Sequence, residues 1–165
     1  MSAEKKNIYR QAREAAGLTR EEASEQLEIM SVDRIGRIEN DIYPPYPIEA
    51  LLMAKIYREP SLCNYYCAQE CPIGQQYVPE IRLKGLSQIV LEVLSSLNAM
   101  EKSSAKFVDI AVDGKIGDDE LADFLEIQQN LERISVTVET LQLWAEQMLA
   151  TGKINKEKYK ELTKK

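Results

Sequence analysis

The sequence contains no histidine, which removes the side chain that most often serves as a general base or a metal ligand. The motifs of nucleotide-binding and hydrolytic sites, G-x-G-x-x-G, the P-loop and G-x-S-x-G, are missing as well. Nothing in the chain therefore argues for catalysis, and we expect neither an enzyme nor a bound cofactor.

Long apolar runs are also absent. No run of roughly 18 apolar residues, the length of a membrane-spanning helix, occurs in the chain. The first ten residues, MSAEKKNIYR, lack the apolar segment of a secretory signal. We therefore expect a cytoplasmic protein without a membrane partner. With 44% hydrophobic residues in 165, the chain can bury a core and form one compact domain or two small ones.

Acidic charge is concentrated in the second half of the chain. Residues 79–150 hold 13 acids and 6 bases, whereas residues 1–60 hold 11 acids and 9 bases. The formal net charge of -6 therefore says little about the partners of the first half.

Short helical segments with stop signals fill residues 1–74. The segment 5–17 ends at Gly17, and the next begins with a capping box of Thr19 and Glu22. Ser31 caps a third segment, the prolines at 44–47 break the chain, and two further segments cover 48–57 and 61–71. These signals predict a head of five short helices.

Residues 79–165 carry a different pattern, an apolar stripe with heptad spacing on each side of a turn at Asp113-Gly114. This pattern predicts a long antiparallel, coiled-coil-like helical hairpin and a final short helix at 155–163, so the fold class is all-α. The first stripe contains Leu86, Val90, Val93, Leu97, Met100, Phe107 and Ala111, and the second contains Phe124, Ile127, Leu131, Ile134, Val138, Leu141, Ala145 and Met148.

More apolar residues flank these stripes than one hairpin can hide. Either the hairpin folds over the head, or two hairpins pair into a four-helix bundle. The length of the arms favours pairing, so we expect a homodimer with residues 79–165 as the dimerisation domain. The candidate dimerisation residues are Ile89, Leu94, Leu121, Leu125, Leu143 and Trp144.

Residues 7–62 resemble the Cro and phage-repressor-like (XRE-type) helix-turn-helix family. The resemblance implies a DNA-binding domain over 1–74, double-stranded DNA as partner, and a bacterial or phage transcriptional regulator. The matching residues are Arg13, Gly17-Leu18-Thr19, Glu21-Glu22, Leu27, Ser31 and Ile35-Gly36-Arg37-Ile38-Glu39.

The resemblance implies that the helix at 31–39 enters the major groove. Ile35 and Ile38 face inward, so we expect Arg34 and Arg37 on the outer side, within reach of guanine edges or phosphates. Glu39 is expected to be structural, with Arg13 as its partner. The full set of candidate DNA-binding residues is Arg20, Ser31, Val32, Asp33, Arg34, Gly36 and Arg37.

The chain departs from the family pattern at three places. Arg20 stands where glutamine is usual, the turn 27–31 is one residue longer and has no glycine, and Asn40 replaces a closing glycine. We expect Asn40 to adopt the left-handed conformation of that glycine. The alternative is a helix-turn-helix fold used for contact with a protein partner, since fold alone does not fix function.

Two patterns imitate metal sites. Cys63, Cys67 and Cys71 repeat every four residues, but the spacing is unusual for zinc and a fourth ligand is missing. We expect reduced thiols that pack like small apolar side chains. Residues 109–120 imitate a calcium loop, but Ala111 stands where an acidic ligand is needed. A plain turn is the simpler interpretation, so no metal is expected at either place.

Overall fold

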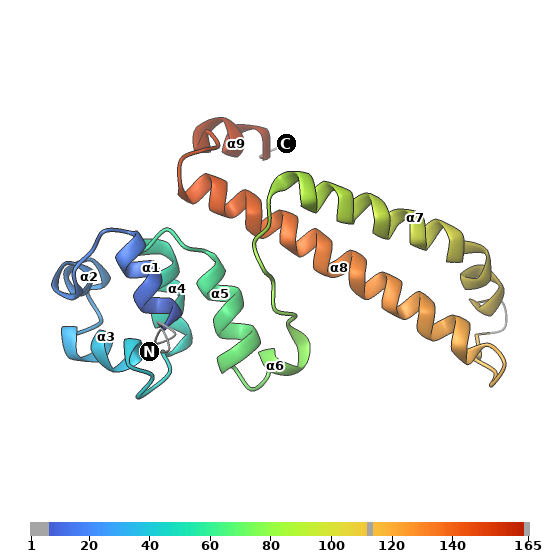
Figure 1. The fold of residues 1–165 in the computed structure, drawn as a ribbon, viewed down its shortest axis with the longest axis horizontal. Coiled ribbons are helices and arrows are strands. Elements are labelled where there is room, and N and C mark those ends of the chain that lie inside the picture. Colours follow the sequence, from blue (N-terminus) through green and yellow to red (C-terminus); the bar gives the residue numbers. More distant parts are fainter. Residues whose placement is uncertain (1–6, 112–113, 164–165) are drawn as a thin grey trace, which may run out of the picture. The chain divides into compact units, whose positions relative to one another are not determined.

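The computed structural model describes residues 7–111 and 114–163, and over these ranges it contains helices and no strand (Figure 1). The all-α prediction is therefore confirmed. The chain divides into two compact units, residues 1–81 with 145–165, and residues 82–144. The end of the hairpin's second arm thus belongs to the first unit. No helix within the described ranges is long and apolar enough to cross a membrane.

The first unit contains the five-helix head that the stop signals predict. Its helices are α1 (Ile8–Ala15), α2 (Arg20–Leu27), α3 (Val32–Glu39), α4 (Pro47–Ile56) and α5 (Ser61–Tyr65). A π-helical turn, η1 (Tyr66–Glu70), continues α5, and the short α6 (Gly74–Tyr77) follows.

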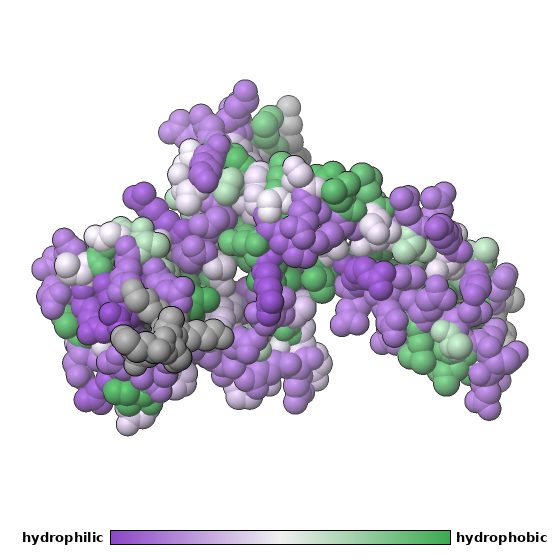
Figure 2. Space-filling view, in the orientation of Figure 1, coloured by the Kyte–Doolittle hydropathy of each residue, from purple (hydrophilic) through white to green (hydrophobic). Residues whose placement is uncertain are grey.

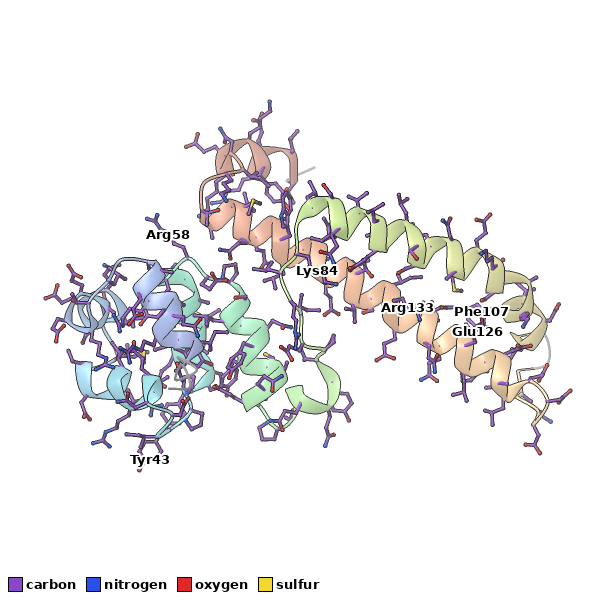
Figure 3. The ribbon with its side chains drawn as sticks, viewed as in Figure 1. Tyr43, Arg58, Lys84, Phe107, Glu126 and Arg133 are labelled. Atoms are coloured by element: carbon purple, nitrogen blue, oxygen red, sulfur yellow. The ribbon has the colours of Figure 1, made fainter. Side chains whose placement is uncertain are left out.

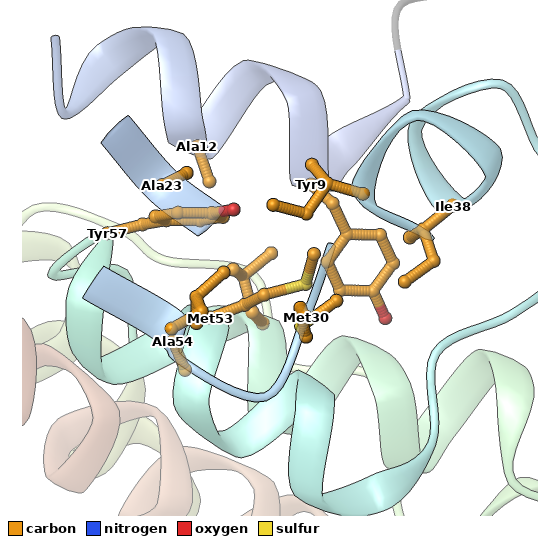
Figure 4. Packing of buried hydrophobic residues seen from close by; sticks show 11 residues of the cluster. Tyr9, Ala12, Ala23, Met30, Ile38, Met53, Ala54 and Tyr57 are labelled. Atoms are coloured by element: carbon orange, nitrogen blue, oxygen red, sulfur yellow. The ribbon is translucent and has the colours of Figure 1, made fainter. Parts of the chain in front are cut away.

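One apolar core holds α1 to α5 together (Figure 4). Tyr9 lies at its centre, with its ring edge-on to Tyr65 at 6.0 Å between centroids. The Tyr9 hydroxyl donates to a carboxylate oxygen of Glu70 at 2.8 Å, so the polar tip of this buried ring is satisfied. Ile35 and Ile38 of α3 are fully buried in the same core, which fixes the opposite face of α3 outward.

The ends of the helices follow the predicted caps with one correction. Thr19 and Glu22 form the capping box at α2, and Gly17 closes α1 at a φ of 74°. At the end of α3 the prediction for Asn40 is wrong, because Asn40 has a φ of -101° and Asp41 has a φ of 56°. The Asp41 and Ile42 amides donate to carbonyls of α3, which places the left-handed residue one position later.

The second unit contains the predicted hairpin, formed by α7 (Leu86–Ala111) and the first 24 residues of α8 (Leu121–Ala150). Lys106 of α7 pairs with Asp123 of α8 at 2.6 Å near the turn. The predicted turn residue Asp113 lies outside the described residues, and Gly114 has a φ of 68°. The predicted final helix is α9 (Lys156–Thr163), capped by Asn155.

The seam of the hairpin differs from the predicted leucine stripes. The buried row of α7 is Ile89, Ser96, Ser103 and Ile110, which recur every seven residues. The Ser103 hydroxyl donates to the Ala99 carbonyl and accepts from the Asn130 amide of α8, both at 3.3 Å. The hydroxyl of Ser103 is thus satisfied within the seam, so the two helices can pack on this small polar side chain.

Ile127 of the predicted second stripe is buried in the seam, but the leucines of both stripes and the valines Val90 and Val138 remain exposed. Hydrophobic surface is visible along this unit (Figure 2). Two of the candidate dimerisation residues, Ile89 and Leu143, are buried within the single chain. The prediction that they lie exposed beside the seam is therefore wrong. Trp144 is half-buried. Leu94, Leu121 and Leu125 are exposed, as the sequence predicted.

Candidate nucleic-acid interface

The turn between α2 and α3 is held by hydrogen bonds from both sides. Glu28 has a φ of 56° and a ψ of -44°, a strained combination that glycine adopts more cheaply, and the Ile29 amide donates to the Leu27 carbonyl at 2.6 Å. The Ser24 hydroxyl donates to the Met30 carbonyl at 2.7 Å, and the Met30 side chain is buried in the core. The longer turn is thus compatible with two helices that share one core.

The outer face of α3 carries Asp33 and Arg37 at its centre. Ser31 caps the helix by accepting from the Arg34 amide at 3.2 Å, as the sequence predicted. Arg37 Nε pairs with an Asp33 carboxylate oxygen at 2.9 Å, and both side chains are at least half exposed. Val32 is exposed at the first turn. The outermost charges of the helix therefore form a solvent-facing ion pair, which contributes little to stability, so Arg37 can leave Asp33 for a ligand at little energetic cost.

Glu39 anchors the inner side of α3, and its predicted pairing with Arg13 is confirmed. Arg13 donates to the two Glu39 carboxylate oxygens at 2.6 and 3.0 Å and to the Leu18 carbonyl at 2.6 Å. Burial alone would raise the pKa of Glu39, but the hydrogen bonds from Arg13 and Arg20 outweigh it, so the pKa lies below its ordinary value. The carboxylate is thus ionised and ties α1 to α3.

Arg20 joins the same carboxylate from α2. Its Nε donates to Glu39 at 2.7 Å, and a third of its side chain stays exposed. A Cβ added at Gly36 would lie 3.9 Å from Arg20 Nη1. The guanidinium of Arg20 therefore extends beside Gly36 on the surface of α3.

Arg34 makes more contacts within the head than the sequence predicted. It donates to both Glu49 carboxylate oxygens at 2.9 and 2.6 Å and to the Pro44 carbonyl at 3.0 Å. Its guanidinium lies 4.9 Å from the centre of the Tyr46 ring, within range of a cation–π interaction. These contacts use Nε and Nη2, so Nη1 is the part of Arg34 that can reach a ligand.

Glu49 was missed by the sequence reasoning. It is nearly buried at the start of α4, and it also accepts from the Tyr46 amide at 2.6 Å. Burial raises its pKa, whereas the hydrogen bonds from Arg34 and Tyr46 lower it more, so the net pKa is below the ordinary value. The only sequence signal was an acid in the first turn of a helix, which indicates a cap and not a partner for Arg34.

A depression of about 470 Å³ lies beside α3, lined by Asp33, Arg34, Arg37 and the loop residues Tyr43, Pro44 and Tyr46. Tyr43 projects from the surface of the head in this loop (Figure 3). The aromatic lining was also missed, because the sequence marked this loop only as a helix break.

The cysteine segment gives no sign of a metal centre. Cys63, Cys67 and Cys71 are half-buried free thiols, and Cys63 packs against the core. Burial raises the pKa of Cys63, which makes it a less reactive thiol. In the described ranges, no three histidine, cysteine, aspartate or glutamate side chains gather as metal ligands. Of the imitated calcium loop, Asp113 lies outside the described residues, and Glu120 accepts from the Gly117 amide at 3.0 Å.

The helix-turn-helix family model matches residues 10–61, the segment that holds α1 to α4. These residues form a helix-turn-helix domain of the Cro and phage-repressor-like, XRE-type family. The match supports a DNA-binding regulator of this kind, and the family is generally non-enzymatic. Neither the curated proteins nor the solved structures yield a match to this chain.

Proposed function

We propose that the protein is a sequence-specific transcriptional regulator of phage-repressor type that reads DNA through α3 and acts as a homodimer. The observation that best supports this proposal is that α3 is capped and presents an outward face within a segment that matches the helix-turn-helix family. In such domains the first turn and outer face of the second helix of the motif meet base edges.

We assign different roles to the side chains on this face. Arg37 and Asp33 meet base edges, since an arginine reads guanine and an acid accepts from cytosine. Arg20 contributes its free guanidinium end to a phosphate, and the amides behind Ser31 receive another. Arg34 is mainly a positioning residue, because Glu49 holds it on two sides, while its Nη1 remains available for DNA.

The hairpin supports dimerisation through its exposed apolar face. With about 100° between successive residues, Leu86, Val90 and Leu97 lie on one side of the Ile89 row. Leu131 and Val138 follow the α8 seam in the same rotational sense, and in an antiparallel pair this places them on the same face. All five are exposed, and full burial of each is worth about 1.5–3 kcal/mol.

A second copy of the same chain would cover this face and form a four-helix bundle. The hairpin unit, residues 82–144, thus carries the dimer interface within the predicted domain 79–165, and two heads read two half-sites about 34 Å apart. Sedimentation equilibrium tests this arrangement. We expect twice the chain mass of 18.8 kDa at micromolar concentration.

A matched pair of variants separates this face from general hydrophobicity. Leu97→Glu should give a monomer, whereas Leu91→Glu should leave the dimer intact. Leu91 is more exposed than Leu97, 68% against 51%, but it lies on another side of α7. Equal behaviour of the two variants, or a monomeric parent, refutes the proposed interface.

DNA reading is tested by selection from random duplexes with the purified chain. We expect one enriched motif, bound with an affinity that falls as salt rises, since each neutralised phosphate releases counterions. A slope of small magnitude is expected, because Arg20, Arg34 and Arg37 each already face a carboxylate.

Contact with a protein is the second candidate, and the same carboxylates favour it. They leave little excess positive charge around α3, while Tyr43 and Tyr46 are exposed beside it. Exposed tyrosines and arginines are typical of protein interfaces. A selection experiment that yields no DNA motif and no salt-dependent binding would favour contact with a protein over DNA binding.

A further inference from the structure

The first unit contains a pocket of about 540 Å³ that the DNA-reading function does not use. Its walls are α4, the turn into α5, the last turns of α8 and the start of α9. The volume falls in the range of pockets that hold small organic ligands, roughly 300–1,000 Å³. The apolar part of the lining is formed by Leu51, Ala54, Pro60, Leu149 and Ala150.

Positive charge surrounds this apolar lining. Lys55, Arg58 and Lys156 line the pocket together with the carboxylate Glu146. Glu157 lines the adjoining hollow, which Arg58 and Lys156 share. Within the described residues, 7–111 and 114–163, none of these three cations forms an ion pair with an acid. In a chain with a net charge of -6, three unpaired cations at one apolar pocket are complementary to an anionic head group.

Arg58 occupies a backbone position that glycine would occupy more cheaply. It ends α4 in the left-handed conformation at a φ of 57°, where Gly17 and Gly152 end α1 and α8. The cap therefore needs no arginine, and the exposed side chain of Arg58 projects from this turn (Figure 3). A strained position that carries a long cation at a pocket indicates a role for that cation.

We propose that this pocket binds a small amphipathic anion, with an apolar body against Leu51, Leu149 and Ala150 and a carboxylate between Arg58 and Lys156. Arg58 is the main partner of the head group, because a guanidinium meets a carboxylate with two parallel hydrogen bonds. Lys55 supplies further positive charge, and Glu146 discriminates against ligands with a second negative group.

Occupation of the pocket ties together segments that are far apart in the chain. At present Gln147 Nε2 donates to the Arg58 carbonyl and to Glu59 at 3.3 and 3.4 Å, which are long contacts. The ligand adds a bridge between α4 and the end of α8. If the proposed DNA function holds, the ligand is also an effector, since α4 carries Glu49, the partner of Arg34 in α3.

Isothermal titration of the full chain with decanoate tests the pocket without any DNA. We expect saturable one-to-one binding below the micellar range of decanoate, and no binding of decylamine, which has the same apolar body and the opposite charge. Arg58→Glu and Lys156→Glu should each weaken decanoate binding at least tenfold. The control Lys160→Glu makes the same charge change on an exposed position of α9 and should bind like the parent.

Ala150→Leu provides an independent variant that keeps every charge and fills the apolar part of the pocket. We expect it to remain helical by circular dichroism and to lose decanoate binding. Absence of decanoate binding by the parent overturns the proposal, as does equal binding of decylamine or equal weakening by Lys160→Glu. DNA affinity with and without decanoate is measured separately, so a failure of the DNA function leaves the ligand result interpretable.

Discussion

Replacing Gly36 by alanine should make the protein more stable and a poorer DNA binder. Gly36 lies inside α3 and has no left-handed φ, so its backbone conformation suits alanine. The nearest atoms to an added Cβ are Arg20 Nη1 at 3.9 Å and Cζ at 4.0 Å, which is ordinary van der Waals contact. The substitution therefore meets no steric resistance within the folded chain.

The expected gain in stability is about 1 kcal/mol, the difference in helix propensity between glycine and alanine. For a chain of this size such a gain raises the melting temperature by about 2–4 °C. The added methyl group lies beside Arg20, on the surface of α3 that we propose approaches DNA. We expect a loss of about 1–2 kcal/mol in binding, or about 5- to 30-fold in affinity.

Thermal unfolding and fluorescence anisotropy with a selected duplex measure the two effects on the same sample. Gly85→Ala is the control for the DNA measurement, because a Cβ there meets nothing within 4 Å and the position lies outside the helix-turn-helix. A Gly36→Ala variant that is more stable and binds DNA as tightly as the parent would refute the docking of this side of α3. A destabilised variant would contradict the inference that the methyl group of alanine fits beside Arg20.

Further substitutions test the turn and the buried acids. Glu28→Gly should stabilise the chain by about 1 kcal/mol by relieving the strained positive φ of Glu28, and an unchanged urea midpoint would contradict this. Because the pKa of Glu39 is depressed from 4.5, its stabilisation is present above the unfolded pKa and lost as pH falls below about 4.5. Urea titrations should therefore give a smaller stability difference between parent and Glu39→Gln at pH 3 than at pH 7. Glu49→Gln should weaken DNA binding by releasing Arg34, and an anisotropy titration unaffected by it would remove Arg34 from the interface.

Local signals in the sequence predicted the helices of the head well. Caps such as Thr19 with Glu22 and stops such as Gly17 act within one helical turn, so they can be read from neighbouring residues. The pairing of Arg13 with Glu39 spans 26 residues, and it was predicted from the family resemblance. The hydrogen bonds from Arg34 to Glu49 could not be predicted, because they depend on how α4 packs against α3.

The hairpin shows a second limit of reading a sequence. Both the leucine stripe and the row through Ile89, Ser96 and Ser103 have heptad spacing, and hydrophobicity alone favours the leucines. The structure buries the serine row instead, since Ser103 satisfies its hydroxyl on the Ala99 carbonyl and on Asn130. Hydrogen bonds within the seam thus decide which face of the hairpin stays exposed, and with it the proposed dimer interface.

The most direct test of DNA reading by α3 is the affinity of the Arg37→Ala variant for a selected duplex and for a scrambled duplex of the same composition. We expect the parent to prefer the selected duplex by about 10³-fold or more. The variant should lose about 1–3 kcal/mol on the selected duplex and should relax its preference at one base pair. A parent that binds both duplexes equally, or a variant that keeps the full preference, contradicts the assignment of α3 as the reading helix.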